Sequence, residues 1–475
     1  MGSYHCFLIL LKIGALTSKV SAFKGRPWEI KYLGGVDIGD NLCCPLLLDL
    51  KGRSVVKASP TFNHGLNLEW VSDKARYIHE SNNSRSRFSW PIYRSKPTKK
   101  FYTKILYSEY SKTLLKAWST KSNNLSVVVN QSLDLNALFA FKEEARKVGA
   151  DFVSENSSYL NKTFNREYSS TKRLNDLEKI EIGAFIGINP RAEASIANLI
   201  FRLRYLLGNF KSFFIGKAVD STFSARNYGS SVKTFTKSLD GKHHTNLGLY
   251  GLNSKLLTYG DSLSSRFDAI SWIKLYDQLL GIPSHFIRLS TQVNAVGLDY
   301  LGCDHWSSVS SSLLVMPLND KSYKHTYKNP TCIYTTHLAS TIREADLLIP
   351  ISSYLEKETA YLDFRGEYKK CGKVITPFFN AFNSPKEVLG HNLNTRGKFV
   401  FWKRANIAKD INSLATNQTF QASLAFNTKT SVFKLIKSVI KTYLGDPYTP
   451  NCVLKTSPTL VQIKNFQEKQ YFAFI

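Results

Sequence analysis

The chain has few cysteines for its length, and no two of them form a C-x-x-C pair. The seven cysteines are Cys6, Cys43, Cys44, Cys303, Cys332, Cys371 and Cys452. Zinc ribbons and iron–sulfur runs need several thiolates at close, regular spacing, which this scatter does not provide. Cys43 and Cys44 are adjacent, and adjacent residues make a poor disulfide on geometric grounds. We therefore predict reduced, mostly buried thiols and no metal ligands.

The chain also lacks an apolar run of the roughly 18 residues that a membrane span requires. Cys6–Leu11 is a short apolar run that Lys12 ends, and no A-x-A-like signal-peptide cleavage site follows it. We read it as a buried strand or an anchoring segment. An Arg-rich, amphipathic transit peptide is absent as well. The sequence thus predicts no direct membrane span.

Acidic residues are scarce: 36 Asp and Glu stand against 63 Lys and Arg, which gives a net charge of +27. Such a charge suits nucleic acid or an anionic membrane. The basic residues are spread along the chain, however, and the densest cluster, Lys96–Lys104, is short. We therefore predict no nucleic-acid partner. AT-rich coding explains the composition equally well, and the charge also suits docking onto acidic neighbouring proteins.

A hydrophobic fraction of 43% allows a substantial core and more than one domain. Residues 25–95 alternate short apolar runs with Gly and Pro, a pattern typical of a small β-rich domain. Within it, Asp49–Arg53 lies between two apolar runs and reads as a hairpin turn.

Beyond residue 96 the pattern indicates an α/β region. Ile182–Ile188 is a continuous apolar strand, and Phe213–Ile215 supplies the next one. A helix is expected between them, so this order predicts a mostly parallel sheet covered by helices. Cys332–Thr336 and Ala345–Ile349 repeat the theme.

Two segments show helical spacing of apolar residues. The first, with Arg202 and Arg204 off the apolar stripe, consists of Ile196, Leu199, Ile200, Leu203 and Leu207. The second, at 432–444, has a wide apolar face opposed by lysines. We expect it to pack on the core rather than to lie on a membrane.

Four stretches resemble, in order, the large iron–sulfur subunit of respiratory complex I, a non-molybdenum branch of the molybdopterin oxidoreductases. They are IGALTSKVSAFKGRPWE at 13–29, EWVSDKARY at 69–77, GINPRAEA at 187–194 and the segment Arg343–Glu367 with its READLLIP start. The resemblance implies an α/β fold with a small β-rich domain before a molybdopterin-oxidoreductase-like region.

The same resemblance shows which ligands are missing. Leu11 stands where the family has the last cluster cysteine before this region, and Ser72 replaces a thiolate of the small domain. We therefore expect residues 1–24 to be a junction to a separate cluster-bearing chain, residues 25–95 to be the small domain with its cluster lost, and residues 96–475 to lack the cofactor. This would make the protein a split subunit that carries no cofactor, with the iron–sulfur clusters on its partner chain.

The implied function is that of a structural, non-catalytic subunit of NADH:ubiquinone oxidoreductase, on the matrix side of the mitochondrial inner membrane. Its partners would be the separate cluster-bearing half and other matrix-arm subunits, and no transit peptide would be needed for a protein made inside the organelle. An active molybdopterin oxidoreductase similar to formate dehydrogenase is the alternative. It would need a metal-ligating side chain and cysteines in register, which are not found.

Several residues tempt a catalytic or metal reading. Arg191 could hold a phosphate. We favour a structural role instead, in which Asn189 caps a helix and Arg191 pairs with Glu193 or another neighbour. His243–His244 and Cys303–His305 lack further ligands. The sequons at 156 and 161 are expected by chance. We predict no catalytic, cofactor or metal residue.

Arg26, Pro27 and Trp28 are the predicted interface residues, because in the family this stretch joins the cluster half to the present half. Trp28 would be the buried aromatic anchor of that contact. The alternative is a tryptophan buried within the small domain of this chain.

Overall fold

The computed structural model describes residues 21–93, 103–104, 126–154, 177–231, 255–273, 284–305, 313–314, 332–337, 347–377 and 446–473, apart from 22, 64, 85, 88–89, 149–150, 178–179, 218, 267, 270 and 447. The predicted strand at Cys6–Leu11, the position of Leu11, most of the basic cluster at 96–104 and the helix at 432–444 lie outside the described residues. So do both sequons and His243–His244.

A three-stranded antiparallel sheet forms the small N-terminal unit, in the order β1-β2-β3. Its strands are β1 (Lys31–Val36), β2 (Pro45–Lys51) and β3 (Ser54–Pro60). Lys51 pairs with Ser54 across a tight turn in which Gly52 has φ +60°, a conformation that glycine adopts without strain. The predicted hairpin at Asp49–Arg53 is therefore confirmed. The 3₁₀ turn η1 (Pro27–Glu29) precedes β1, and helices α2 (Asp73–Tyr77) and η2 (Ile78–Asn83) follow β3.

A five-stranded parallel sheet forms one part of the α/β region, in the order β10-β9-β8-β11-β12. Its strands are β8 (Ile182–Ile186), β9 (Lys211–Ile215), β10 (Arg226–Asn227), β11 (Lys255–Tyr259) and β12 (Ser284–Arg288). The helices between them are α6 (Pro190–Glu193), α7 (Ser195–Leu206) and α9 (Asp261–Ser264). Every residue of β8 is buried, as expected for an apolar strand covered on both faces.

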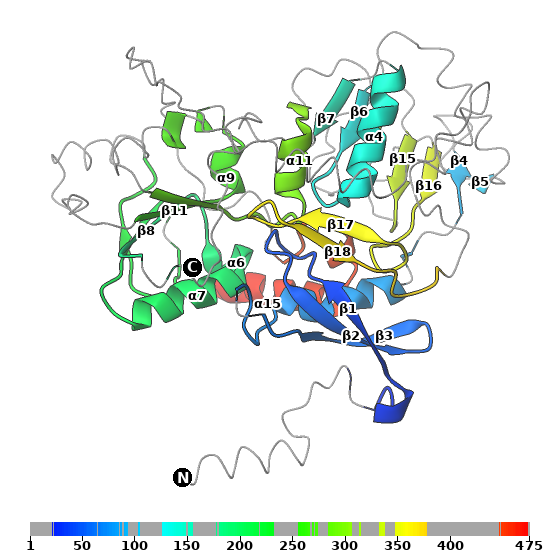
Figure 1. Cartoon of the computed structure of the whole chain (residues 1–475), viewed down its shortest axis with the longest axis horizontal. Helices are drawn as coiled ribbons and strands as arrows, with labels where there is room; N and C mark the ends of the chain where they lie inside the picture. Colours follow the sequence, from blue (N-terminus) through cyan, green and yellow to red (C-terminus); the bar gives the residue numbers. More distant parts are fainter. Residues whose placement is uncertain are drawn as a thin grey trace.

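Two further four-stranded sheets lie on the other side of the molecule (Figure 1). The first is parallel and contains β6 (Ser126–Val129), β7 (Asp151–Ser154), β13 (Asp304–His305) and β14 (Leu313–Leu314), with helices α4 (Leu135–Val148) and α11 (Ala295–Leu301) beside it. The second is mixed and contains β4 (Ile92–Tyr93), β5 (Thr103–Lys104), β15 (Cys332–Thr335) and β16 (Leu347–Pro350). The predicted parallel pair at 332–336 and 345–349 is thereby confirmed.

The segment Arg343–Glu367 leads into a hairpin formed by β17 (Thr359–Leu362) and β18 (Tyr368–Cys371). This hairpin lies between the small sheet and the α/β region (Figure 1). Apolar residues of the small sheet, of this hairpin and of the C-terminal helices α14 (Cys452–Lys455) and α15 (Pro458–Ala473) share one core. The C-terminus therefore returns to the N-terminal unit.

The overall α/β class, with a small β unit and mostly parallel sheets, agrees with the sequence prediction. The division at residues 24 and 95 stays a prediction; β4, which starts before residue 95, pairs with β16 of the α/β region.

The prediction of an apolar, buried stripe on α7 is wrong at the C-terminal end of the helix. Leu203 and Leu207 are exposed, whereas Arg204 is buried and donates to the carbonyl oxygens of Ile180 at 2.8 Å and Gly208 at 2.6 Å. At the C-terminal end of α7, the carbonyl groups of Ile180 and Gly208 face the Arg204 side chain. A long cationic side chain satisfies both of them, which a leucine cannot do.

Candidate functional site

The predicted interface residues lie at the outer end of the small sheet, beyond the start of β1 (Figure 1). Arg26, Pro27 and Trp28 are all exposed, and Trp28 keeps 76% of its surface in water. The Arg26 guanidinium lies over the Trp28 ring at 5.5 Å. The alternative that Trp28 is buried inside the small domain is therefore wrong, while the contact with another chain stays a prediction.

Glu29 fixes the shape of this tip. Its carboxylate accepts a hydrogen bond from the Arg26 backbone N–H at 3.3 Å and pairs with Lys51 at 2.7 Å. The hydrogen bond from Lys51 and that from the Arg26 backbone hold the pKa of Glu29 below its usual value. Trp28 is thus presented by a turn that is tied to the β2–β3 hairpin.

Ser72, at the predicted position of a lost thiolate, has a structural role. Its hydroxyl oxygen accepts a hydrogen bond from the Ala75 N–H at 3.1 Å and so caps α2. The same hydroxyl donates to Asp37 at 3.0 Å. The side chain that stands at this position therefore holds a helix start and a buried carboxylate together.

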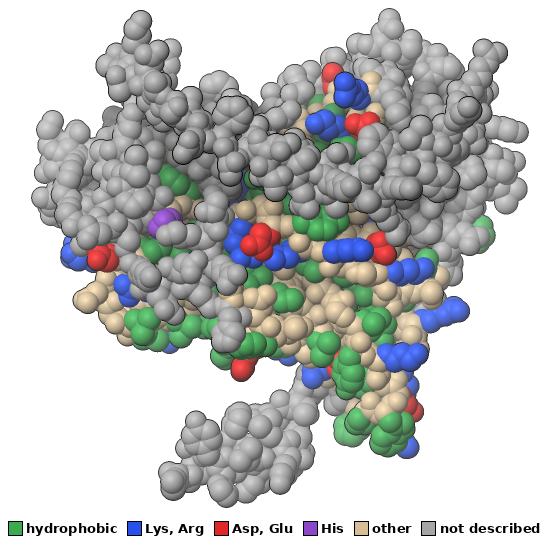
Figure 2. All heavy atoms as spheres, viewed as in Figure 1, with side chains coloured by type: hydrophobic (Ala, Val, Ile, Leu, Met, Phe, Trp, Pro, Cys, Tyr) green, Lys and Arg blue, Asp and Glu red, His purple; other side chains and the backbone are tan. Residues whose placement is uncertain are grey.

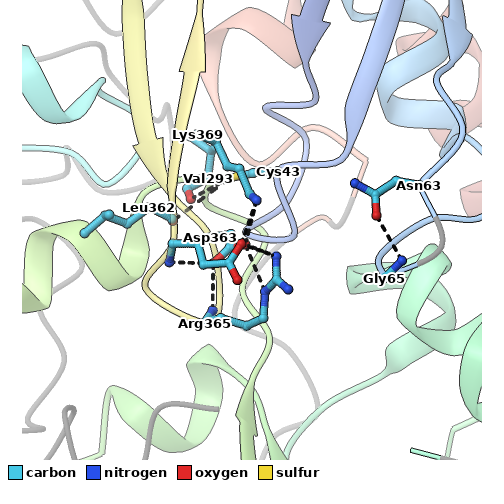
Figure 3. Close-up of polar contacts among 9 residues, drawn as sticks. Cys43, Asn63, Gly65, Val293, Leu362, Asp363, Arg365 and Lys369 are labelled. Carbon is cyan, nitrogen blue, oxygen red and sulfur yellow. Dashed lines mark hydrogen bonds and ion pairs between the residues drawn. The ribbon is translucent and has the colours of Figure 1, made fainter. Parts of the chain in front are cut away.

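Cys43 and Cys44 are buried, unbridged thiols. The Cys43 Sγ lies 3.8 Å from the Val293 carbonyl oxygen and 4.0 Å from that of Leu362, next to the Asp363 turn (Figure 3). Burial, with the nearby charge of Asp363 as the next cause, raises the pKa of Cys43 well above its usual value. This surrounding favours the thiol over the thiolate that binds iron.

Asp363 organises the turn between β17 and β18. Its carboxylate accepts hydrogen bonds from the backbone and the guanidinium of Arg365, the latter at 2.8 Å, and lies 3.7 Å from the Lys369 amine (Figure 3). Gly366 closes the turn with φ +79°. Within Arg343–Glu367 the structure therefore has two strands, β16 and β17, followed by the turn at Asp363–Gly366.

The carboxyl ends of β8, β11 and β12 meet at one edge of the parallel sheet, where open α/β proteins bind ligands. After β8, Asn189 occupies the N-cap position of α6, but its side chain makes no capping hydrogen bond. Instead, the Asn189 N–H donates to the Glu193 carboxylate at 3.0 Å. The expected side-chain cap is therefore wrong.

Arg191 follows the carboxyl end of β8 as well. Its side chain is 55% exposed and pairs with Asp220, which follows β9, rather than with Glu193. Of the two predicted partners, Glu193 or another neighbour, the structure therefore has the other neighbour, Asp220. A surface ion pair of this kind contributes little to stability.

Asn41, in the loop between β1 and β2 of the small unit, contacts this edge of the parallel sheet. Its side-chain amide donates to the Arg288 carbonyl oxygen and accepts from the Ser290 N–H, both at 3.0 Å, while its own N–H donates to the Ser290 carbonyl oxygen at 3.1 Å. Ser290 in turn donates to Asp261 at 2.6 Å. The loop between β1 and β2 is therefore hydrogen-bonded to the C-terminal end of β12.

Buried carboxyl groups surround this contact. Lys74 donates to the Glu193 carbonyl oxygen at 2.8 Å and is the cation that acts on Asp37 and Asp40. Burial, together with the charge of Asp37, raises the pKa of Asp40 to about 7. Burial also raises the pKa values of Asp37 and Glu193.

The residues at this edge do not fit an anionic pterin dinucleotide. Such a group would have to displace Asn41, whose side chain is hydrogen-bonded to the backbone of Arg288 and Ser290. The residues of the small unit fit a cluster no better, because residues 30–80 offer two adjacent thiols in place of four spaced ones. Within the described ranges, no three His, Cys, Asp or Glu side chains are grouped to hold a metal ion.

Cys303 is partly buried, and the following residues Asp304–His305 form β13. Asn41, Lys74 and Asp40 were not foreseen from the sequence. The run Asp37–Asn41 has the composition of a turn, which signals a loop but not the strand end that the loop contacts.

The sequence of this chain matches two known family models. Residues 109–384 match the molybdopterin oxidoreductase family, and residues 30–80 match the 4Fe-4S domain of the NADH-ubiquinone oxidoreductase NDSU1/NuoG type. The chain belongs to the molybdopterin oxidoreductase family. The second match places a cluster-domain sequence within this chain, so the expectation that no cofactor is bound here stays a prediction.

Three curated relatives illustrate the similarity. The chain is 26% identical to the NADH-ubiquinone oxidoreductase 75 kDa subunit of Reclinomonas americana, over 95% of this chain and 71% of the relative. It is 23% identical to the mitochondrial 78 kDa subunit of Candida albicans, over 95% and 66%. It is 28% identical to the 75 kDa subunit of Dictyostelium citrinum, over 73% and 52%. The chain thus spans between half and about 70% of these relatives.

Among the described helices, none is long and apolar enough to cross a membrane.

Proposed function

We propose that this chain is a structural subunit of the matrix arm of NADH:ubiquinone oxidoreductase, without an active site of its own. The observation that carries the proposal is the occupied sheet edge: Asn41 is hydrogen-bonded at the C-terminal end of β12, and the buried Glu193 follows β8, at the edge where this fold class binds its ligand. The similarity to complex I subunits along 95% of the chain supports the same conclusion.

In this role the chain contacts a partner that carries the iron–sulfur clusters and holds it in position, while electrons pass between clusters on other chains. The tip formed by Arg26, Pro27 and Trp28 is the proposed contact. A large, exposed aromatic ring stacked with a guanidinium is typical of the residues that dominate binding energy. We place the assembly at the mitochondrial inner membrane.

The test is the change Trp28→Ala. Because truncation removes the anchor, association with the cluster-bearing partner should weaken by about 2 kcal/mol or more. A pull-down of the partner measures it, and a melting curve of the free chain should be unchanged, since Trp28 makes no buried contacts at home. Trp70, exposed on the same unit, supplies the control Trp70→Ala, which should pair normally. Normal pairing of the Trp28 variant would remove the proposed contact.

The second candidate is an active molybdopterin oxidoreductase, which the family membership of residues 109–384 favours. The metal and pterin content of the purified chain separates the two.

A further inference from the structure

The outer edge of β1 is open along its first half. The order β1-β2-β3 places β1 at the border of the small sheet, and no described strand pairs with its other side. Lys31–Gly34 are exposed on both faces of the strand, with Tyr32 at 56% and Leu33 at 40%. An exposed edge strand with apolar side chains is a template for an added strand.

The hydrogen bonds fix which backbone groups point outward. Asp37 N–H donates to the Cys44 carbonyl oxygen at 2.8 Å, so position 37 faces β2. The pairing of β1 with β2 has no bulge, and backbone groups alternate sides with a period of two. Leu33 and Gly35 therefore also face β2, whereas the N–H and C=O groups of Tyr32 and Gly34 point away from the sheet.

Val36 supports this assignment, because its N–H is directed at the Cys371 thiol of β18. The inner end of the outer edge is thus covered by the β17–β18 hairpin. Tyr32 and Gly34 lie past that cover, next to Trp28.

The charge around β1 indicates which kind of partner segment pairs with its open edge. Between residues 23 and 63, the described exposed cations outnumber the single exposed acid, Glu29, which Lys51 already neutralises. The exposed cations are Lys24, Arg26, Lys31, Lys51, Arg53 and Lys57. Figure 2 shows apolar side chains gathered at this lower end of the molecule with Lys and Arg beside them. A partner with acidic residues fits this surface.

Residues 1–20 of the same chain fit it less well, because they carry Lys12 and Lys19 and no acid. A second copy of the chain would bring the same cations against each other. We infer that an extended segment of the cluster-bearing partner, apolar and flanked by Asp or Glu, pairs with Tyr32 and Gly34 as a fourth strand of the small sheet. This inference rests on the proposed function and names how the partner binds.

Hydrogen–deuterium exchange resolved to single amides tests the inference first. In the free chain, the amides of Tyr32 and Gly34 should exchange rapidly and those of Leu33 and Gly35 slowly. In the assembled complex, Tyr32 and Gly34 should become protected by about a hundredfold or more. Protection already present in the free chain would assign the edge to residues 1–20, or to a second copy if it grows with concentration. Either result, or rapid exchange in the complex, overturns the inference.

Gly34→Pro and Gly34→Ala form a matched pair that separates strand pairing from simple coverage. A Cβ at position 34 meets nothing within 4 Å, so the alanine variant does not clash within the chain. Proline removes the outward N–H and fixes φ at position 34, whereas alanine keeps the N–H. Proline should therefore weaken association at least about tenfold, with alanine within about threefold. Equal binding of the two variants overturns strand pairing.

Trp28→Ala keeps this result distinct from the proposed function. If it weakens pairing while Gly34→Pro does not, the contact stands and the added strand is wrong. Carbodiimide, which joins an amine to a carboxyl group, tests the charge: a Lys31 cross-link to Asp or Glu of the partner is expected. Its absence, with Lys31 accessible to acetylation only before assembly, overturns the acidic character of the segment.

Discussion

At the scale of single residues, the buried acidic side chains and their hydrogen-bond partners are the most unusual feature of this protein. Asp40 is fully buried; one carboxylate oxygen accepts from the Leu42 N–H at 3.1 Å, and the other has no partner among the described residues. Water would solvate that oxygen in the unfolded chain, which is why burial raises the pKa. Nothing in the run Asp37–Asn41 reveals this burial, because the loop is held by Asn41 against the distant end of β12.

The pH dependence of stability follows from Asp40. Its pKa is raised to about 7 in the folded chain and is ordinary in the unfolded one, so the folded state binds the extra proton. The stabilising contribution is present at low pH and is lost as the pH rises through 7. Between pH 6 and pH 8 the wild type should lose on the order of 1 kcal/mol through this group, and Asp40→Asn should not.

Urea unfolding of both proteins at the two pH values measures the difference. Asp73→Asn, at an exposed carboxylate of α2, is the control and should follow the wild type. An Asp40→Asn variant whose pH dependence matches that of the wild type contradicts the assignment.

At the scale of elements, strands and turns were predictable and the inward face of a helix was not. β8, β9, β15 and β16 follow from continuous apolar runs, and the β2–β3 hairpin follows from Gly52 between them. In α7 the period predicts the buried positions Ile196 and Ile200 but places Arg204 outside. Two carbonyl groups at the end of the helix reverse that assignment, and the sequence gives no sign of them.

Arg204→Ala tests the role of this side chain. It would leave the carbonyl oxygens of Ile180 and Gly208 without donors and uncover Phe210, whose ring the guanidinium covers at 5.6 Å. We expect a loss of about 2 kcal/mol in the free energy of unfolding. Arg202→Ala, on the exposed face of the same helix, should stay within about 0.5 kcal/mol of the wild type. Similar losses in the two variants, measured by urea unfolding, would count against the buried role.

At the scale of the whole molecule, the small sheet and the parallel sheet are joined where the fold class has its ligand site. Asn41 bonds to the end of β12, and Lys74 bonds to the end of α6. The β1–β2 loop and α2 of the small unit are therefore anchored on the ends of elements of the parallel-sheet region.

The purified chain should accordingly contain no iron, zinc or molybdenum near one equivalent, and no pterin. The physical reason is the donor set: the resemblance puts Leu11 and Ser72 at positions of family thiolates, and burial raises the pKa of the Cys43 thiol. Metal analysis, pterin fluorescence after oxidation and the visible spectrum measure this. Near-unit iron with cluster-type absorbance would show that residues 30–80 still bind a cluster, and molybdenum with pterin would favour the active enzyme.

The sequence by itself determined the α/β class, the hairpin and the apolar strands, because these depend on local period and turn chemistry. Tertiary structure alone decided that Arg204 faces inward, that Asn41 closes the sheet edge, that Asp40 is buried and that Trp28 and the edge of β1 stay exposed. Each of these depends on groups far apart in the chain, such as Asn41 and Ser290, and a local pattern carries no information about such contacts.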